Sequence, residues 1–96
     1  MPAYWIVRMN VTNAEPYEEY KKRTPAALAK YGGRFLARGG RVEVLEGDVP
    51  PARIVLIEFP SFEQAVACYR SPEYREAKHF REGAADAQIV VVEGLQ

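Results

Sequence analysis

Two periodicities alternate along this chain, and their order leaves few folds open. Runs rich in aromatic and β-branched residues predict strands, whereas apolar residues three and four apart predict helices. Strand patterns occupy residues 3–11, 34–45, 53–59 and 88–93, and helical patterns occupy residues 14–31 and 62–82. This order predicts the ferredoxin-like βαββαβ arrangement, an α+β fold with both helices on one face of a four-stranded antiparallel sheet. At 96 residues, we expect a single domain over residues 1–96.

Glycine, serine and proline mark the boundaries of these elements. The glycine pair at 32–33 should end the first helix, because glycine adopts the left-handed conformation found at helix C-termini. Ser61 opens a capping-box pattern, and Ser71 with Pro72 restarts the second helix. The glycine pair at 39–40 lies inside the second strand and predicts a bulge or a sharp bend there.

Alternation along the strands assigns each residue to one side of the predicted sheet. One side is uncharged and suits the helices, with Trp5, Val7, Met9, Phe35, Ala37, Val55, Ile57, Phe59, Val90 and Val92. The opposite side holds Tyr4, Ile6, Arg8, Leu36, Arg38, Ile54, Leu56, Glu58, Ile89, Val91 and Glu93. This second side is too rich in large aliphatic side chains to face water, since apolar patches of a few hundred Å² usually mark interfaces. We expect a second copy of the chain to cover it, sheet against sheet about a two-fold axis.

Three charged residues on that second side form the first candidate site. With the first and third strands as parallel neighbours, Glu58 is expected beside Arg8 and close to Arg38. Two guanidinium groups beside one carboxylate leave a net positive charge, which predicts binding of a small anion or of a partner carboxylate such as Glu46 or Glu93. The alternative is an ion network that only fixes the register of the dimer.

Hydroxyl and imidazole groups on the second helix form the second candidate site. The group consists of Ser61, Tyr69, Ser71, Tyr74 and His79, which are candidates to line a pocket in which His79 or a tyrosine moves a proton near neutral pH. Structural roles explain the same residues: Ser61 as a helix cap, the tyrosines as core, and His79 as part of a solvated helix face. Cys68 has no histidine or acidic partner at a useful spacing, so no nucleophilic role is expected.

Charge and composition narrow the expected partners and compartment. Thirteen Lys and Arg residues balance thirteen Asp and Glu residues, which argues against a surface for nucleic acid or anionic membrane. No apolar run approaches the ~20 residues of a membrane helix, and the chain starts in strand-like sequence without a leader. The single cysteine excludes an internal disulfide. Together these features favour the cytoplasm. We also expect no metal or cofactor, because no pair of His, Cys or carboxylate residues has the spacing of metal ligands.

Several motifs agree in order and spacing with a known family. They are the glycine-marked stretch 32–40, residues 45–47, the run 53–61, the segment 65–74 and Arg81. Through these motifs the chain resembles, over nearly its whole length, the small bacterial family known as domain of unknown function 1330. The resemblance implies a dimeric α+β barrel, in which ferredoxin-like subunits pair through their sheets. The wider superfamily includes cofactorless monooxygenases, isomerases and binding proteins, so the resemblance implies no single reaction.

Two kinds of function therefore stay open. The first is a cofactorless enzyme of isomerase, lyase or monooxygenase type, in which Arg38 anchors a small organic acid and His79 or a tyrosine moves protons. The second is a module that binds a small ligand without changing it, or a purely structural dimer.

Overall fold

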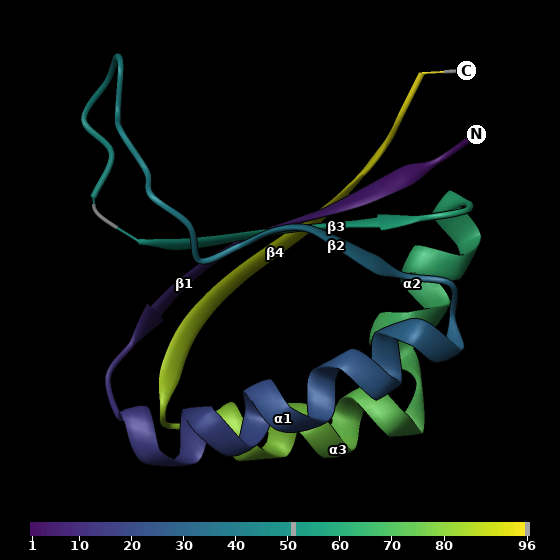
Figure 1. The fold of residues 1–96 in the computed structure, drawn as a ribbon, viewed down its shortest axis with the longest axis horizontal. Coiled ribbons are helices and arrows are strands. Elements are labelled where there is room, and N and C mark those ends of the chain that lie inside the picture. Colours follow the sequence, from purple (N-terminus) through teal and green to yellow (C-terminus); the bar gives the residue numbers. More distant parts are fainter. Residues whose placement is uncertain (51, 96) are drawn as a thin grey trace.

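Four strands and three helices alternate in the computed structural model, which describes residues 1–50 and 52–95 (Figure 1). They are β1 (Ala3–Val11), α1 (Ala14–Lys30), β2 (Arg34–Arg38), β3 (Arg53–Phe59), α2 (Phe62–Arg70), α3 (Pro72–Arg81) and β4 (Ala85–Glu93). This order confirms the predicted βαββαβ plan, with the second helix divided at Ser71 into α2 and α3. Ser71 lies between them because its hydroxyl accepts a hydrogen bond from the Tyr74 N–H at 3.1 Å and caps α3.

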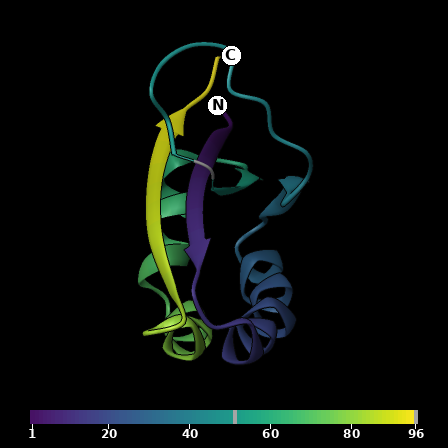
Figure 2. The same cartoon turned by 90° about the vertical axis from the view of Figure 1, so that its left-hand side faces the viewer.

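The sheet has the strand order β2-β3-β1-β4, and all of its neighbouring strands are antiparallel. The prediction that the first and third strands run parallel is wrong. A helix returns the chain so that β2 runs in the direction of β1, and the hairpin that follows reverses it, so β3 opposes β1. The three helices cover one side of this sheet in both views (Figures 1 and 2); we call the other side the outer face.

Trp5 lies at the centre of the core between the sheet and the helices. Its side chain is 1% exposed, and the indole Nε1–H donates to the backbone oxygen of Ala65 at 3.0 Å. The rings of Phe59 and Tyr74 pack against it, with centroids 5.2 and 5.1 Å away. The indole therefore joins β1 to α2 and α3 through both burial and a satisfied hydrogen bond.

Strand β4 places its side chains opposite to the predicted assignment. Val7 pairs with Ile89, and Trp5 pairs with Val91, so Ile89 and Val91 pack against the core. Val90, 58% exposed, and the neighbouring Val92 point to the outer face instead. The run 89–92 is uniformly aliphatic, so its sequence carries no alternation from which the side could be read.

A bulge in β2 also reverses part of the predicted assignment. Phe35 pairs with Ile57, but the next paired residue is Ala37, opposite Leu56, so Leu36 is the extra residue. Arg38 then lies opposite Val55 and on the helix side of the sheet, whereas the prediction had put it on the outer face.

The predicted flaw at 39–40 falls where the strand ends, not inside it. Gly39 has a φ of +67°, which favours glycine, and its N–H donates to the backbone oxygen of Ile54 at 3.0 Å. Residues 41–45, predicted as strand, are not part of the described sheet.

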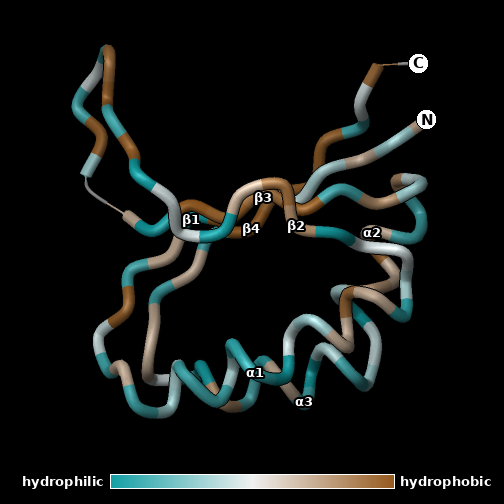
Figure 3. The backbone as a smooth tube through the Cα atoms, in the orientation of Figure 1, coloured by the Kyte–Doolittle hydropathy of each residue, from teal (hydrophilic) through white to brown (hydrophobic). Residues whose placement is uncertain are grey.

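The outer face carries exposed aliphatic side chains. Its exposed members are Ile6, Leu36, Val90 and Val92. Figure 3 colours the strands largely hydrophobic, while the helices mix hydrophobic and hydrophilic residues. The described helices include none with the length and apolar character that a bilayer crossing requires.

Candidate functional site

A narrow aromatic cleft lies between α1 and the helix side of the sheet. Its lining residues come from α1 and from three strands: Trp5, Val7, Met9, Tyr17, Tyr20, Lys21, Thr24, Phe35, Arg38, Arg53, Val55 and Ile57. The cleft has a volume of about 20 Å³, roughly the space that one water molecule occupies. Two arginines and a lysine are its charged lining residues, and no acidic side chain is among them.

Arg38 stands exposed at the edge of this cleft because the bulge at Leu36 turns it to the helix side. Its Nη2 donates to the backbone oxygen of Lys21 in α1 at 2.8 Å. Its guanidinium also lies over the Phe35 ring, 4.3 Å from the centroid. These contacts use a carbonyl and a ring face, and no carboxylate among the described residues forms an ion pair with Arg38.

Arg53, at the start of β3, brings a second guanidinium to the same cleft. Its Nε is buried and has no hydrogen-bond partner among the described residues. The guanidinium carbon lies 5.8 Å from the centroid of the Tyr17 ring. A Cβ at Gly39 would meet only the guanidinium of Arg53, the far end of a flexible side chain that can shift, so it is the positive φ of Gly39 that favours glycine there.

Two buried tyrosines of α1 supply hydroxyl groups to the cleft. Burial raises the pKa of Tyr17 above its usual value, and the charge of Arg53 lowers it only in part. The hydroxyl of Tyr20 is 2.8 Å from that of Tyr74, whose pKa is also raised by burial. Both Tyr17 and Tyr74 are therefore protonated near neutral pH and can donate hydrogen bonds.

The predicted trio of Arg8, Glu58 and Arg38 does not come together. Glu58 pairs with Tyr4 across the sheet and accepts a hydrogen bond from Nε of Arg34 at 2.7 Å; Nη2 of Arg34 lies 2.7 Å from the same carboxylate oxygen in an ion pair. Arg8 lies further along β1, opposite Ile54. The prediction is wrong because it assumed parallel pairing of β1 with β3 and an unbroken alternation in β2.

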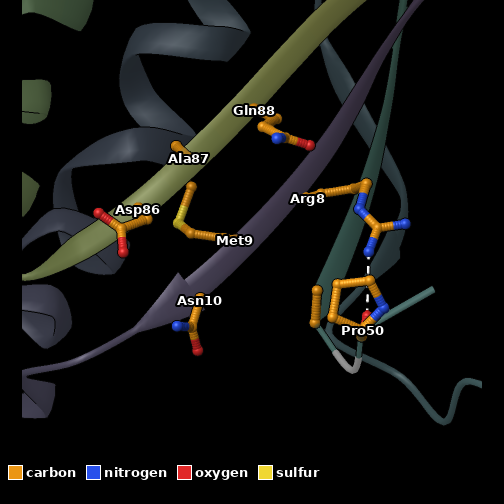
Figure 4. Close-up of a pocket in the computed structure, with 8 residues that line it drawn as sticks. Arg8, Met9, Asn10, Pro50, Asp86, Ala87 and Gln88 are labelled. Carbon is orange, nitrogen blue, oxygen red and sulfur yellow. Dashed lines mark hydrogen bonds between the residues drawn. The ribbon is translucent and has the colours of Figure 1, made fainter. Parts of the chain in front are cut away.

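Arg8 instead borders a depression on the outer face (Figure 4). Its Nη2 donates to the backbone oxygen of Pro50 at 3.0 Å. The depression has a volume of about 360 Å³ and is lined by Arg8, Met9, Asn10, Pro50, Ala52, Asp86, Ala87 and Gln88. Half of its lining residues are polar or charged, whereas the cleft on the other side of the sheet is lined mostly by aromatic and aliphatic side chains. A ligand-binding role for Arg8 or Glu58 stays a prediction.

The second predicted group is spread over the two later helices. Ser61 caps α2 by accepting from the Gln64 N–H at 3.1 Å, as its capping-box pattern predicts. Tyr69 packs edge-on against Trp5 at 6.0 Å. His79 is exposed on α3 and is not among the residues lining the aromatic cleft. Their catalytic or binding roles stay predictions, and of this group only Tyr74 reaches a cleft residue through a hydrogen bond.

Cys68 is completely buried in α2. Burial raises the pKa of its thiol to about 12, which keeps it protonated and weakly nucleophilic at neutral pH. Its Sγ–H is directed at the backbone oxygen of Ala27, 3.9 Å away. These features fit packing between α1 and α2.

Sequence reasoning missed Arg53, although a signal for it exists. Arg53 lies two residues before Val55 in the same strand, so its side chain points to the same side as Val55, Ile57 and Phe59, which the alternation assigns to the helix side. A cation on the buried side of a central strand needs a special environment. Its position in the alternation of the strand therefore identifies Arg53 as a candidate site residue from the sequence alone.

Several solved structures share this fold. The RPA0582 protein of unknown function from Rhodopseudomonas palustris is 23% identical and has a TM-score of 0.78, with 99% of this chain and 83% of that chain covered. SnoaB from Streptomyces nogalater, a cofactor-independent oxygenase, is 14% identical with a TM-score of 0.69, covering 99% and 94%. A dimeric protein of unknown function and ferredoxin-like fold from Bacteroides fragilis is 19% identical with a TM-score of 0.59, covering 97% and 96%. These likenesses confirm the ferredoxin-like fold.

The sequence itself gives the narrower relationship. The comparison with curated proteins finds no match. One family model, described as Domain of unknown function (DUF1330), matches residues 2–95. The chain belongs to this family.

Proposed function

We propose that the protein acts on a small conjugated organic acid as a cofactorless enzyme, and that the acid binds in the aromatic cleft between α1 and the sheet. The observation that carries this proposal is the presence of Arg38 and Arg53 at one cleft that has no acidic lining residue. Guanidinium groups bind carboxylates through paired, charge-assisted hydrogen bonds. The aromatic walls suit the flat, apolar body of such an acid.

Tyr17 is the group best placed to take part in chemistry. Burial raises the pKa of its hydroxyl, so the group keeps its proton and suits donation of a hydrogen bond to negative charge developing on a substrate. Negative charge that develops on the substrate is common to the isomerase, lyase and monooxygenase types of reaction. The cofactor-independent oxygenase among the proteins of similar fold supports this class of reaction as a proposal for the present chain.

The cleft must widen before a ligand enters. A volume of about 20 Å³ is far below the ~300 Å³ typical of small-molecule sites. The contact of Arg38 with the carbonyl of Lys21 closes one side of the cleft and is not a bond within regular secondary structure. We expect a bound carboxylate to replace that carbonyl as the partner of Arg38.

The structural roles of the predicted proton-transfer groups favour a second candidate, a binding module without catalysis. Ser61 and Tyr74 form hydrogen bonds that have structural roles, and His79 lies outside the cleft. None of these three predicted residues therefore needs a catalytic role to explain its position. The two candidates share the ligand and differ in whether a product forms.

We also propose that the protein is a cytoplasmic homodimer joined through its outer faces. The exposed aliphatic side chains of this face support the dimer, because water contact with them is costly. The dimeric protein of similar fold from Bacteroides fragilis supports it further. The free, buried Cys68 is compatible with a reducing compartment.

Ligand binding is tested by NMR titration with benzoate, cinnamate and crotonate, with benzamide as the uncharged control. We expect at least one acid to shift resonances of the cleft, and Arg38→Ala and Arg53→Ala each to weaken its binding about tenfold or more. Arg75→Ala removes a guanidinium from the exposed face of α3 and should leave the affinity unchanged. Equal binding of benzamide, or no effect of either cleft arginine, contradicts the proposal.

Catalysis is tested by following the bound acid for product by NMR and mass spectrometry. For an enzyme, Tyr17→Phe should lower turnover while the affinity stays within about twofold, because the ring and the arginines remain. Stoichiometric binding with no product, for every acid that binds, favours the module without catalysis.

A further inference from the structure

Residues 39–50 form an arm that leaves the sheet between β2 and β3. The arm rises on the outer side, away from all three helices, in both views (Figures 1 and 2). Each of its residues is exposed. Its hydrogen bonds within the described residues lie at its two ends, from the Gly39 N–H to Ile54 and from Arg8 to the Pro50 carbonyl. The middle of the arm therefore has little to hold it in its own chain.

The arm carries apolar side chains that are unusual in a solvated loop. Val42, Val44 and Val49 are 46%, 47% and 39% exposed, and Leu45 is 90% exposed. Residues 41–44 alternate charged and apolar side chains, the pattern of a strand with one buried side. This pattern explains why the segment was predicted as strand, although the described chain offers it no partner strand. The pattern indicates that a surface of another molecule covers the apolar side of this segment.

We propose that the arm of one copy packs on the outer face of a second copy, with Val42, Val44 and Leu45 against that copy's exposed aliphatic side chains. This inference rests on the proposed homodimer and deepens it, because it names the segment that crosses the interface. In a two-fold dimer the contact occurs twice, so each arm holds the other copy.

The direction and length of the arm favour a second copy as its occupant. The arm projects to the same side of the sheet as the aliphatic residues Ile6, Val90 and Val92, so two outer faces brought together place each arm beside the other sheet. An extended loop of twelve residues that goes out and returns reaches about 20 Å. Crossing four strands requires about 15 Å, so the arm is long enough to cover them.

The charges of the arm and of the outer face are complementary, which also favours a second copy of the chain as the partner. The arm carries Glu43, Glu46 and Asp48 against one Arg41, an excess of negative charge. Arg8 on the outer face uses one donor on a carbonyl of Pro50, and its guanidinium keeps further donors for a carboxylate. The partner's arm can provide that carboxylate.

The dimer dissociation constant of arm and face variants tests the inference, measured by sedimentation equilibrium. We expect the double variant Val44→Asp with Leu45→Asp to raise it at least tenfold, and Val90→Asp on the outer face to raise it as well. The matched control is Lys22→Gln with Lys21→Gln on α1, which makes the same change in net charge on the helix side. Leu45 is solvent-exposed, so circular dichroism should show that the arm variant stays folded.

Each result has a distinct meaning. A monomeric wild type overturns both the proposed dimer and the arm contact. If Val90→Asp weakens the dimer and the arm variant does not, only the arm contact is overturned. An equal effect of the α1 control also overturns it, because net charge would then explain the change.

A second measurement does not depend on affinity. A photoreactive amino acid replaces Leu45 in ¹⁵N-labelled protein, which is mixed with unlabelled protein before irradiation. We expect cross-links from labelled position 45 to unlabelled peptides of β1 or β4. Cross-links confined to the labelled chain, or to the helices, overturn the inference.

Discussion

The hydroxyl groups of Tyr20 and Tyr74 form a hydrogen bond with each other in the core, where each would otherwise be buried without that partner. Tyr20 is 7% exposed and Tyr74 is fully buried, so neither can bond to bulk water. Arg81, also buried, lies with its guanidinium 5.6 Å from the centroid of the Tyr20 ring. The pair links α1 to α3 and connects the wall of the aromatic cleft to the core behind it.

Replacing Tyr74 by Phe removes one member of the hydroxyl pair and keeps the ring. We expect a loss of about 1 kcal/mol in the free energy of unfolding, because the Tyr20 hydroxyl then stays buried without its partner. Urea unfolding of the single variants and of the double variant with Tyr20→Phe measures the coupling, and the double variant should lose less than the sum of the singles. Tyr69→Phe, which removes a hydroxyl outside the pair, is the control. Strict additivity would contradict the assigned coupling.

The structural roles of individual residues differ in how well the sequence predicts them. The two serine caps were predictable because Ser61 and Ser71 act through contacts three residues away. Tyr74 was proposed for the core or a site, but its hydroxyl partner is 54 residues distant and has no sequence signature. Arg53 was overlooked because a charge at the start of a strand is normally exposed.

Strand β2 is the element whose irregularity decides where the cleft arginine lies. Simple alternation puts Phe35 and Ala37 on one side and Arg38 on the other, and the extra residue Leu36 changes that assignment. The sequence has glycines nearby, which predicted an irregularity, but the bulge itself contains no glycine. Pairing with β3 determines the position of a bulge, so the strand's own residues do not reveal it.

Deleting Leu36 should make β2 regular without moving Arg38. Ala37 and Arg38 already pair with Leu56 and Val55, and removal of the extra residue leaves those pairs intact. We expect nuclear Overhauser contacts between the Arg38 side chain and the Phe35 ring to persist, with only a small loss of stability because Leu36 is 48% exposed. Transfer of the Arg38 contacts to Ile54 or Leu56 on the outer face would contradict this register. Leu36→Ala, which keeps the chain length, is the control.

At the scale of the whole molecule, the helices cover one side of the sheet and leave the other open. The order of elements predicted this layering correctly, because local periodicity and short connections determine it. The prediction of an apolar outer face also holds, although Val90 and Val92 replace Ile89 and Val91 as its β4 members. In a uniformly aliphatic run the sequence does not show which residues face the helices; the register of β4 with β1 determines it.

If two outer faces close on each other, folding and association are one equilibrium, and the melting temperature must depend on protein concentration. For a chain of this size we expect each tenfold increase in concentration to raise Tm by about 4 °C, since the unfolding enthalpy of the dimer is about twice that of one chain. Differential scanning calorimetry between micromolar and millimolar concentrations measures the shift. Val90→Asp should lower the melting temperature and flatten its dependence on concentration, because the charge would be trapped between the faces. A wild-type melting temperature that is the same at all concentrations would mean that the aliphatic outer face is stable in water by itself.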